Sequence, residues 1–290
     1  MFSRRMLTKC MLGLSLLAAT PTGSFAQAGA DLNVSPKRIV FSAETRSSTV
    51  LVFNRGGSEV TYNIDLVDRV MTPDGQIISV ADAAAKPEAA SVAKKVASAT
   101  ALINFTPRRV TLKPGDSQTI RIRVLRPPEL AAGEYRTHLT ITAAPPEDTG
   151  LTAEQAVSAS DGKVAVRLVT VFSISIPLIV RQGGPDVGAT ITDVKYLDAE
   201  PAGGALSLQL TRKGASSLFG DVEVRPAGAP RATVPLGLIR GVGVYPEIDR
   251  RLVQFKLSRA LVRGEHLDIV FRDDDTRSGE TLAAVPFTVP

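Results

Sequence analysis

The residues that could carry catalysis or hold a metal are few and far apart in this chain. Only two of the 290 residues are histidines, His138 and His266, and the single cysteine is Cys10. A zinc site is normally built from several cysteine and histidine ligands. A Ser-His-Asp triad would need the fold to bring a serine and a carboxylate next to one of these histidines, and no sequence motif indicates this. We therefore expect no enzyme, no metal site and no cofactor, and an ordinary role for His138 on a strand.

Two short motifs resemble ligand loops without meeting their requirements. The run Gly241-Val242-Gly243-Val244 has neither the third glycine nor the following helix of a nucleotide-binding loop. The run Asp273-Asp274-Asp275 has no calcium-loop spacing after it. A solvated turn is the expectation for the three aspartates.

The first 28 residues have the three parts of a secretory signal. They are a basic start, a short apolar core and a small-x-small cleavage site: Arg4, Arg5 and Lys9, then 11–19, then Ala26-Gln27-Ala28. Export across the inner membrane is expected, with Cys10 lost in the signal. No later run is apolar for 18 residues, so no membrane insertion is expected. The net charge of +5 falls to about +2 without the signal and is spread along the chain, which argues against nucleic acid as a partner.

The rest of the chain consists of short alternating segments separated by turn residues. We expect strands at 32–41, 48–53, 60–67, 119–125 and 133–142, and after a Gly-Gly-Pro break at 190–196, 206–210, 221–224, 233–236, 252–257, 267–271 and 281–289. This pattern predicts an all-β protein of two immunoglobulin-like β-sandwich domains in tandem, 29–182 and 187–290. The Ala-rich segment 81–101, which contains Pro87, is expected to be a short surface helix or a mobile insert, with the helix favoured. The polar segment 145–162 is expected to be a long loop.

One segment, 164–181, has strand character for about eighteen residues, far beyond an ordinary strand. One of its two rows is almost wholly apolar: Val164, Val166, Leu168, Thr170, Phe172, Ile174 and Ile176. An unpaired strand of this kind promotes aggregation. It is therefore either covered, as a long strand at the seam of the two domains, or made to pair with another chain.

Four motifs, taken in order behind a signal peptide, resemble the periplasmic pilus chaperones of the PapD-like type. They are Pro36-Lys37-Arg38-Ile39-Val40-Phe41, Leu112-Lys113-Pro114-Gly115 before Ile120-Arg121-Ile122, Gly133-Glu134-Tyr135-Arg136, and Ile176-Pro177-Leu178-Ile179-Val180-Arg181. The resemblance covers 31–182 and, more weakly, 187–290. The Ile-Pro-Leu-Ile-Val version is similar to the less typical branches of the family, which serve archaic or spore-coat-like pili.

The resemblance implies a chaperone that captures secreted, pilin-like subunits and delivers them to an outer-membrane usher. The subunits lack a final strand, and the long strand of the chaperone would complete their sheet by donor-strand complementation. By position the donor row is Val164, Val166, Leu168, Thr170 and Phe172. The same strand offers a route to self-association. The alternative is a structural or adhesive two-domain protein of the periplasm or cell surface, in which the strand only joins its own domains.

The resemblance also implies roles for charged residues between the domains. Arg38 matches the first of two cations that anchor the terminal carboxylate of a subunit, whereas the position of the second, a Lys, is occupied by Pro177. Glu134 and Arg181 match residues that hold the two domains at a fixed angle through a salt bridge with an acidic residue of the second domain. One of the three aspartates would be that partner, and we assign Asp275.

Overall fold

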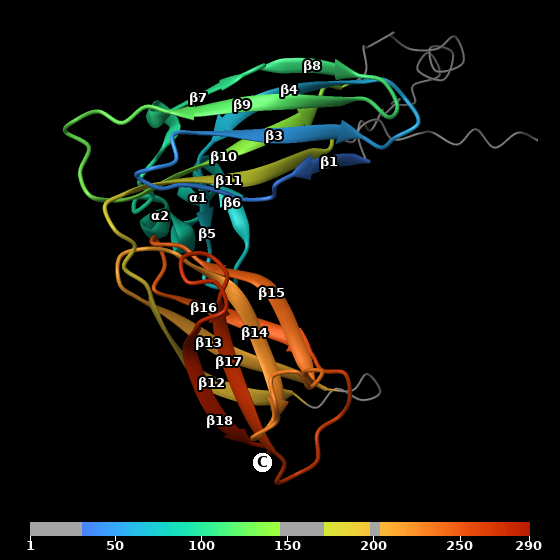
Figure 1. The fold of residues 1–290 in the computed structure, drawn as a ribbon, viewed down its shortest axis with the longest axis vertical. Helices are drawn as coiled ribbons and strands as arrows, with labels where there is room; N and C mark the ends of the chain where they lie inside the picture. Colours follow the sequence, from blue (N-terminus) through green and yellow to red (C-terminus); the bar gives the residue numbers. More distant parts are fainter. Residues whose placement is uncertain (1–30, 146–170, 198–203) are drawn as a thin grey trace, which may run out of the picture.

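The chain folds into two β-sandwiches joined end to end (Figure 1), as seen in a computed structural model that describes residues 31–145, 171–197 and 204–290. In the first sandwich a sheet of order β1-β3-β9-β7 faces a sheet of order β2-β11-β10-β4-β8. Its strands are β1 (Leu32–Ser35), β2 (Ile39–Phe41), β3 (Ser47–Asn54), β4 (Val60–Val67), β7 (Ile103–Thr106), β8 (Arg109–Leu112), β9 (Ser117–Val124), β10 (Gly133–Ala143) and β11 (Ser173–Gln182).

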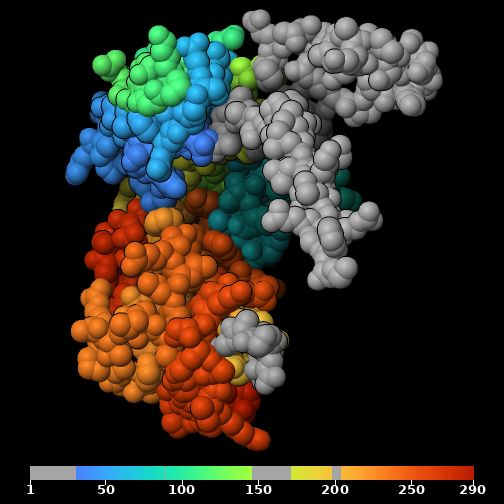
Figure 2. Space-filling model, turned by 90° about the vertical axis from the view of Figure 1, so that its right-hand side faces the viewer, coloured from blue at the N-terminus to red at the C-terminus, as the bar shows by residue number. Residues whose placement is uncertain are grey.

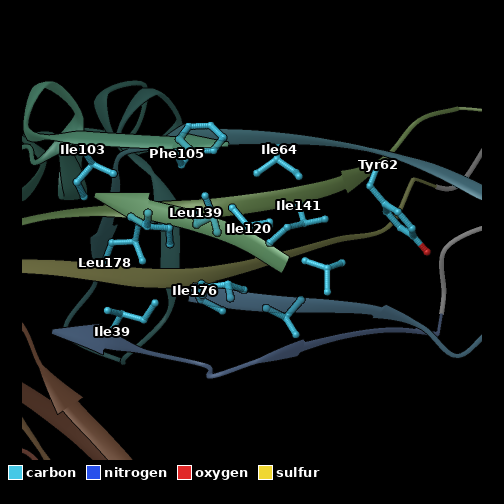
Figure 3. Close-up of a cluster of buried hydrophobic side chains, with 14 of the residues drawn as sticks. Ile39, Tyr62, Ile64, Ile103, Phe105, Ile120, Leu139, Ile141, Ile176 and Leu178 are labelled. Atoms are coloured by element: carbon cyan, nitrogen blue, oxygen red, sulfur yellow. The ribbon is translucent and has the colours of Figure 1, made fainter. Parts of the chain in front are cut away.

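The core of this sandwich is formed by strands in which buried apolar and exposed polar side chains alternate. In β9 the side chains of Ile120, Ile122 and Val124 are buried while Arg121 and Arg123 between them are exposed. Apolar side chains from both sheets meet in one layer, including Tyr62 and Phe105 (Figure 3). Each inward row removes apolar surface from water, which is the main stabilising contribution of a sandwich.

The second sandwich pairs a sheet of order β12-β13-β16 with one of order β15-β14-β17-β18. Its strands are β12 (Gly188–Leu197), β13 (Ala205–Lys213), β14 (Leu218–Pro226), β15 (Gly237–Val244), β16 (Arg250–Lys256), β17 (His266–Asp273) and β18 (Thr281–Thr288). The predicted fold class, all-β with two sandwiches in tandem, is confirmed.

Two of the expected strands were placed wrongly. The segment 32–41 is not one strand, because the chain leaves β1 at Pro36 and re-enters as β2 in the opposite sheet. The segment 233–236 is not a strand: Thr233 N donates to Pro230 O in a turn, and β15 begins only at Gly237. The Gly241–Val244 run lies in that strand.

The Ala-rich insert contains two short helices, α1 (Val80–Ala84) and α2 (Pro87–Ala93), and a 3-10 turn, η1 (Thr100–Leu102). The favoured helix was therefore correct. Ser79 caps α1 by accepting the Asp82 N–H at 3.0 Å. Pro87 starts α2, where a missing N–H costs nothing. Small side chains let the two helices pack closely over Val70, with Ala83, Ala89 and Ala93 buried.

Ahead of these helices lies a hairpin, β5 (Arg69–Met71) and β6 (Ile77–Ser79), which the sequence analysis missed. Its turn contains Gly75 at a φ of 85°, a conformation that favours glycine. Figure 1 places the hairpin between the sandwiches, and Figure 2 shows the insert, in teal, at their junction. Met71 is 3% exposed and belongs to the core of the second sandwich. The hairpin therefore extends from the first domain into the second.

The long strand differs from its prediction. β11 begins at Ser173, whereas Val171 and Phe172 are described and lie outside any strand. Residues 164–170 lie outside the described part of the chain, as do the signal segment and most of the predicted 145–162 loop. Within the described ranges, no helix has both the length and the apolar character that crossing a membrane requires.

Candidate functional site

The first half of β11 is a sheet edge. On one side β10 pairs with β11 along its length, from Thr142↔Ser173 to Gly133↔Gln182. On the other side the short strand β2 pairs only with Leu178, Ile179 and Val180. Within the described residues, 173–177 therefore has no neighbouring strand on its second side. Its backbone groups are positioned to accept one.

The register shows which backbone groups face this free edge. Ala143 N donates to Phe172 O at 2.9 Å, so Phe172 points its backbone toward β10. Since neighbouring residues of an antiparallel strand alternate in direction, Ser173 and Ser175 point their N–H and C=O groups outward. Pro177 also points outward and has no N–H to leave unpaired, which explains why proline fits there. The edge thus offers hydrogen bonds to an added strand.

The side chains of β11 point in two directions. Ile176 is 2% exposed and packs in the core of its own sandwich, with Ile174 partly buried against it. Ser173, Ser175 and Pro177 lie on the opposite face. A hollow of about 370 Å³ separates β11 from β1. The side chains of Ile174 and Ile176 therefore pack inside their own domain and are not free to enter another chain.

The predicted donor row lies mostly outside the described residues, because Val164, Val166, Leu168 and Thr170 belong to 146–170. Phe172 is described and is half-buried just before β11. Its assignment as a donor residue stays a prediction.

Arg181, near the end of β11, brings together the three residues named for the interdomain salt bridge. Its Nε lies 3.0 Å from Glu134 Oε2, and its Nη2 lies 2.5 Å from Asp275 Oδ2. Glu134 Oε2 also accepts hydrogen bonds from the backbone N–H and the hydroxyl of Ser217. All three charged side chains are at most 8% exposed, so the cluster joins β10, β11 and the β17–β18 turn away from solvent.

Arg38 joins this cluster. Its Nη2 lies 2.8 Å from the same Asp275 Oδ2, and its guanidinium lies 4.5 Å from the ring centroid of Phe219. The side chain is 13% exposed. A carboxylate of a partner would have to compete with Asp275 for Arg38. The role of Arg38 as a subunit anchor stays a prediction.

The expected solvated turn at the three aspartates is wrong for two of them. Asp273 is 3% exposed and accepts hydrogen bonds from the backbone N–H groups of Thr276 and Arg277. Desolvation by burial would raise the pKa of Asp275. Hydrogen bonds from Arg38 and Arg181 outweigh it and hold that pKa below its ordinary value of 3.8.

A second ion pair crosses between the domains, and the sequence analysis missed it. Arg136 of β10 binds Glu247 with two hydrogen bonds, of 3.0 and 2.5 Å, and both side chains are at most 4% exposed. The guanidinium also lies 3.7 Å from the ring centroid of Tyr245. Glu247 Oε1 accepts the Met71 N–H at 2.8 Å, which ties the hairpin to the same pair. Arg136 belongs to the Gly133-Glu134-Tyr135-Arg136 motif, but no motif or residue spacing around Glu247 predicts that it pairs with Arg136.

Beside this pair lies a pocket of about 300 Å³. Its walls come from β5, β6, β10, β11 and the second sandwich, and they include Arg69, His138, Ser175, Pro177 and Tyr245. His138 is 3% exposed, so it is a core histidine. Burial, with Arg136 and Arg69 nearby, lowers the pKa of His138 to about 3. Among the described residues, no cluster of histidine, cysteine or carboxylate side chains could hold a metal ion.

Comparison with solved structures finds periplasmic pilus chaperones, the class that the sequence resembles. The YadV chaperone is 12% identical, and the match covers 89% of this chain and all of that one with a TM-score of 0.40. The CupB2 chaperone of Pseudomonas aeruginosa is 16% identical over the same shares, with a TM-score of 0.40. A CsuC–CsuE chaperone–tip subunit complex from archaic pili of Acinetobacter baumannii is 13% identical, covering 90% and 100%, with a TM-score of 0.41. No protein-family profile matches the chain, and no curated protein sequence does.

Proposed function

We propose that this protein is a periplasmic chaperone that captures pilin-like subunits by lending them a strand and hands them to an outer-membrane usher. The observation that carries the proposal is the free edge of β11 at 173–177. This edge begins directly after Phe172, the last residue of the predicted donor row. An incomplete sheet of a subunit would pair with this edge through its own main chain.

The energetics favour such a pairing. Each large apolar side chain buried in the groove of a subunit contributes roughly 1.5–3 kcal/mol. Main-chain hydrogen bonds to Ser173 and Ser175 satisfy polar groups that an open edge leaves to water. The two interdomain clusters, around Arg181 and around Arg136, hold the edge at a fixed position relative to the second sandwich. A preorganised edge loses less entropy on binding.

The test is capture of a subunit by variants that change only the edge. Ser175→Pro removes the outward N–H of residue 175 and places a ring where the added strand would lie. Ser175→Ala is the matched control, since it loses the same hydroxyl, which contacts Thr140 at 2.8 Å, but keeps the N–H. We expect a tagged chain to co-purify from the periplasm with a stoichiometric, small secreted β-protein. Ser175→Pro should abolish this capture and Ser175→Ala should retain it.

A second variant tests the predicted donor row. Leu168→Glu with Phe172→Glu puts charge into the apolar groove of the subunit, which is costly without a partner. Capture should again be lost while the circular dichroism spectrum and unfolding temperature stay close to those of the parent. If no subunit is held by the parent in cells that make one, or if both variants hold it as well as the parent, the protein is a structural two-domain molecule instead.

A further inference from the structure

Arg126 binds four uncharged oxygen atoms at the ends of two strands. Its Nη1 donates to the backbone oxygen of Arg181 at 2.7 Å and to Gln182 Oε1 at 3.0 Å. Its Nη2 donates to the backbone oxygens of Phe41 at 3.1 Å and of Ser42 at 2.5 Å. Phe41 ends β2, and Arg181 and Gln182 end β11. One guanidinium therefore joins the ends of both strands, and we call these four hydrogen bonds the Arg126 clamp.

The backbone around Arg126 is restrained on both sides. On one side the Leu125 N–H donates to Leu102 O at 2.8 Å. On the other side Pro127 and Pro128 follow, and a proline restricts the residue before it to an extended backbone. Within the described residues, no carboxylate lies within 4.0 Å of the Arg126 guanidinium. The side chain is therefore held at the two strand ends and is not drawn away by an acidic neighbour.

The clamp extends a strand pair that is very short. β2 pairs with β11 at only three positions, 178–180. The odd-numbered residues of β11 point their backbone groups away from β10, so the N–H of Ile179 faces β2. The outward carbonyl of Arg181 lies beyond the last paired residue, and Arg126 is the group that bonds it. The guanidinium therefore takes the place of a further backbone donor of β2.

We propose that Arg126 sets the end of the open edge of β11. The clamp holds β2 against residues 178–180, so that an added strand pairs with 173–177 and no further. Without it, three paired residues alone hold β2, and the outward groups of Ile179 and Arg181 can join the open edge. An added strand could then shift by two residues, which keeps its side chains on the same faces. Arg126 is thus a positioning residue for the register of an added strand.

The role in register rests on the proposed function, whereas the clamp itself does not. The clamp also requires an arginine. The two terminal nitrogens of a guanidinium carry four N–H groups in one plane, and here each is matched by one oxygen. A lysine has three donors on a single atom and cannot reproduce this geometry, and a glutamine has only two.

The first experiment measures amide hydrogen exchange residue by residue in chain 29–290, without a partner. Ile179 and Val180 provide an internal comparison, because their N–H groups face β2 and β10 respectively. In Arg126→Gln, exchange at Ile179 should be about tenfold faster than in the parent, whereas exchange at Val180 should be unchanged. Arg126→Lys should fall between the two. Arg123→Gln removes an exposed cation of β9 and should exchange as the parent does.

Two results would overturn the clamp. If exchange at Ile179 is as slow in Arg126→Gln as in the parent, β2 does not depend on the guanidinium. If Ile179 and Val180 speed up by the same factor, Arg126 stabilises the whole sandwich and not the end of the edge. Should Arg126→Gln fail to fold, the same comparison in Arg126→Lys decides.

Exchange in the presence of a captured subunit tests the role in register. In the parent, capture should slow exchange at Ser173 and Ser175 and leave Ile179 unchanged. In Arg126→Gln, capture should also slow exchange at Ile179, because the added strand now reaches it. If Ile179 exchanges equally fast in the free and the bound variant, Arg126 does not set the register. If the parent captures no subunit, the role in register falls with the proposed function, while exchange in the free chain still decides whether Arg126 holds β2.

Discussion

His138 links the stability of the fold to pH. The ring is buried between β4 and β11, and its pKa falls from 6.5 to about 3 because burial and two nearby arginines penalise the charged form. The unfolded chain binds a proton at this residue below about pH 6.5, but the folded chain does not until about pH 3. Stability is therefore lost as the pH falls through this window.

We predict that His138 alone removes about 2 kcal/mol from the free energy of unfolding between pH 7 and pH 5. The measurement is urea unfolding at both pH values for the parent and for His138→Asn. The variant should lack this part of the loss, whatever its stability at pH 7. The exposed His266→Gln is the control and should keep the full loss. A His138→Asn variant with the same pH dependence as the parent would show that the ring is not held neutral.

Residue-level prediction from the sequence depended on whether a motif surrounds the residue. Glu134 and Arg181 stand in motifs that the resemblance assigned, and the structure places them beside Asp275. Glu247 stands in no motif. It meets Arg136 and the Met71 N–H only because the hairpin approaches the other domain, which no local spacing encodes.

At the scale of elements, the β5–β6 hairpin is the part of the first domain that enters the second. Pro73 O accepts the Leu252 N–H at 2.7 Å, so the tip of the hairpin is bonded to β16. Gly75 lies against the guanidinium of Arg251, which in turn donates to Gly243 O at 2.9 Å. A Cβ at residue 75 would overlap this guanidinium, so the tip can dock only with glycine or with a displaced Arg251.

Two glycine substitutions separate backbone strain from docking. Gly75 and Gly115 have nearly equal φ values, 85° and 82°, but a Cβ at Gly115 would meet nothing within 4 Å. Gly115→Ala should cost about 1 kcal/mol of unfolding free energy from the positive φ alone. Gly75→Ala should cost more and should speed hydrogen exchange at Leu252, whose amide bonds Pro73 O. Equal costs and unchanged exchange would mean that the tip does not depend on this contact.

Strands were predicted well from the sequence where apolar and polar residues alternate over the whole length of the strand. β4, β9 and β17 alternate cleanly and were found within about two residues of their bounds. The break at Pro36 was missed because β1 and β2 are both short, and only their partners show that they belong to different sheets. The hairpin was missed because three-residue strands carry too little alternation to detect.

At the scale of the whole molecule, two buried ionic clusters and the β5–β6 hairpin join the sandwiches within the part of the chain that the structure describes. The Arg136–Glu247 pair lies beside the hairpin, and the Arg181 cluster lies at the end of β11. Removing one partner of a buried pair leaves an uncompensated charge, so each cluster resists separation of the domains. The pocket beside the Arg136–Glu247 pair has walls from both sandwiches, so its shape depends on the angle between them. Loss of either cluster should therefore change the position of the free β11 edge relative to the second sandwich without unfolding the sandwiches.

We predict that acid releases the Arg181 cluster. Because the folded pKa of Asp275 lies below 3.8, its contribution is complete above about pH 4 and is lost as the pH falls through the folded value. Spin labels at Glu44→Cys and Val262→Cys, one exposed position in each sandwich, report the distance between domains in residues 29–290, which contain no other cysteine. The distribution should stay narrow from pH 7 to pH 4 and broaden below that, in samples whose circular dichroism spectrum still shows folded sandwiches.

Asp275→Asn should show the broad distribution already at pH 7 and lose about 2 kcal/mol of unfolding free energy, because Arg38 and Arg181 lose their shared carboxylate. Asp274→Asn changes the adjacent, exposed residue and should behave as the parent at every pH. A narrow distribution in Asp275→Asn would show that the hairpin and the Arg136–Glu247 pair fix the angle alone. In that case the Arg181 cluster would be free to exchange Asp275 for a carboxylate of a partner.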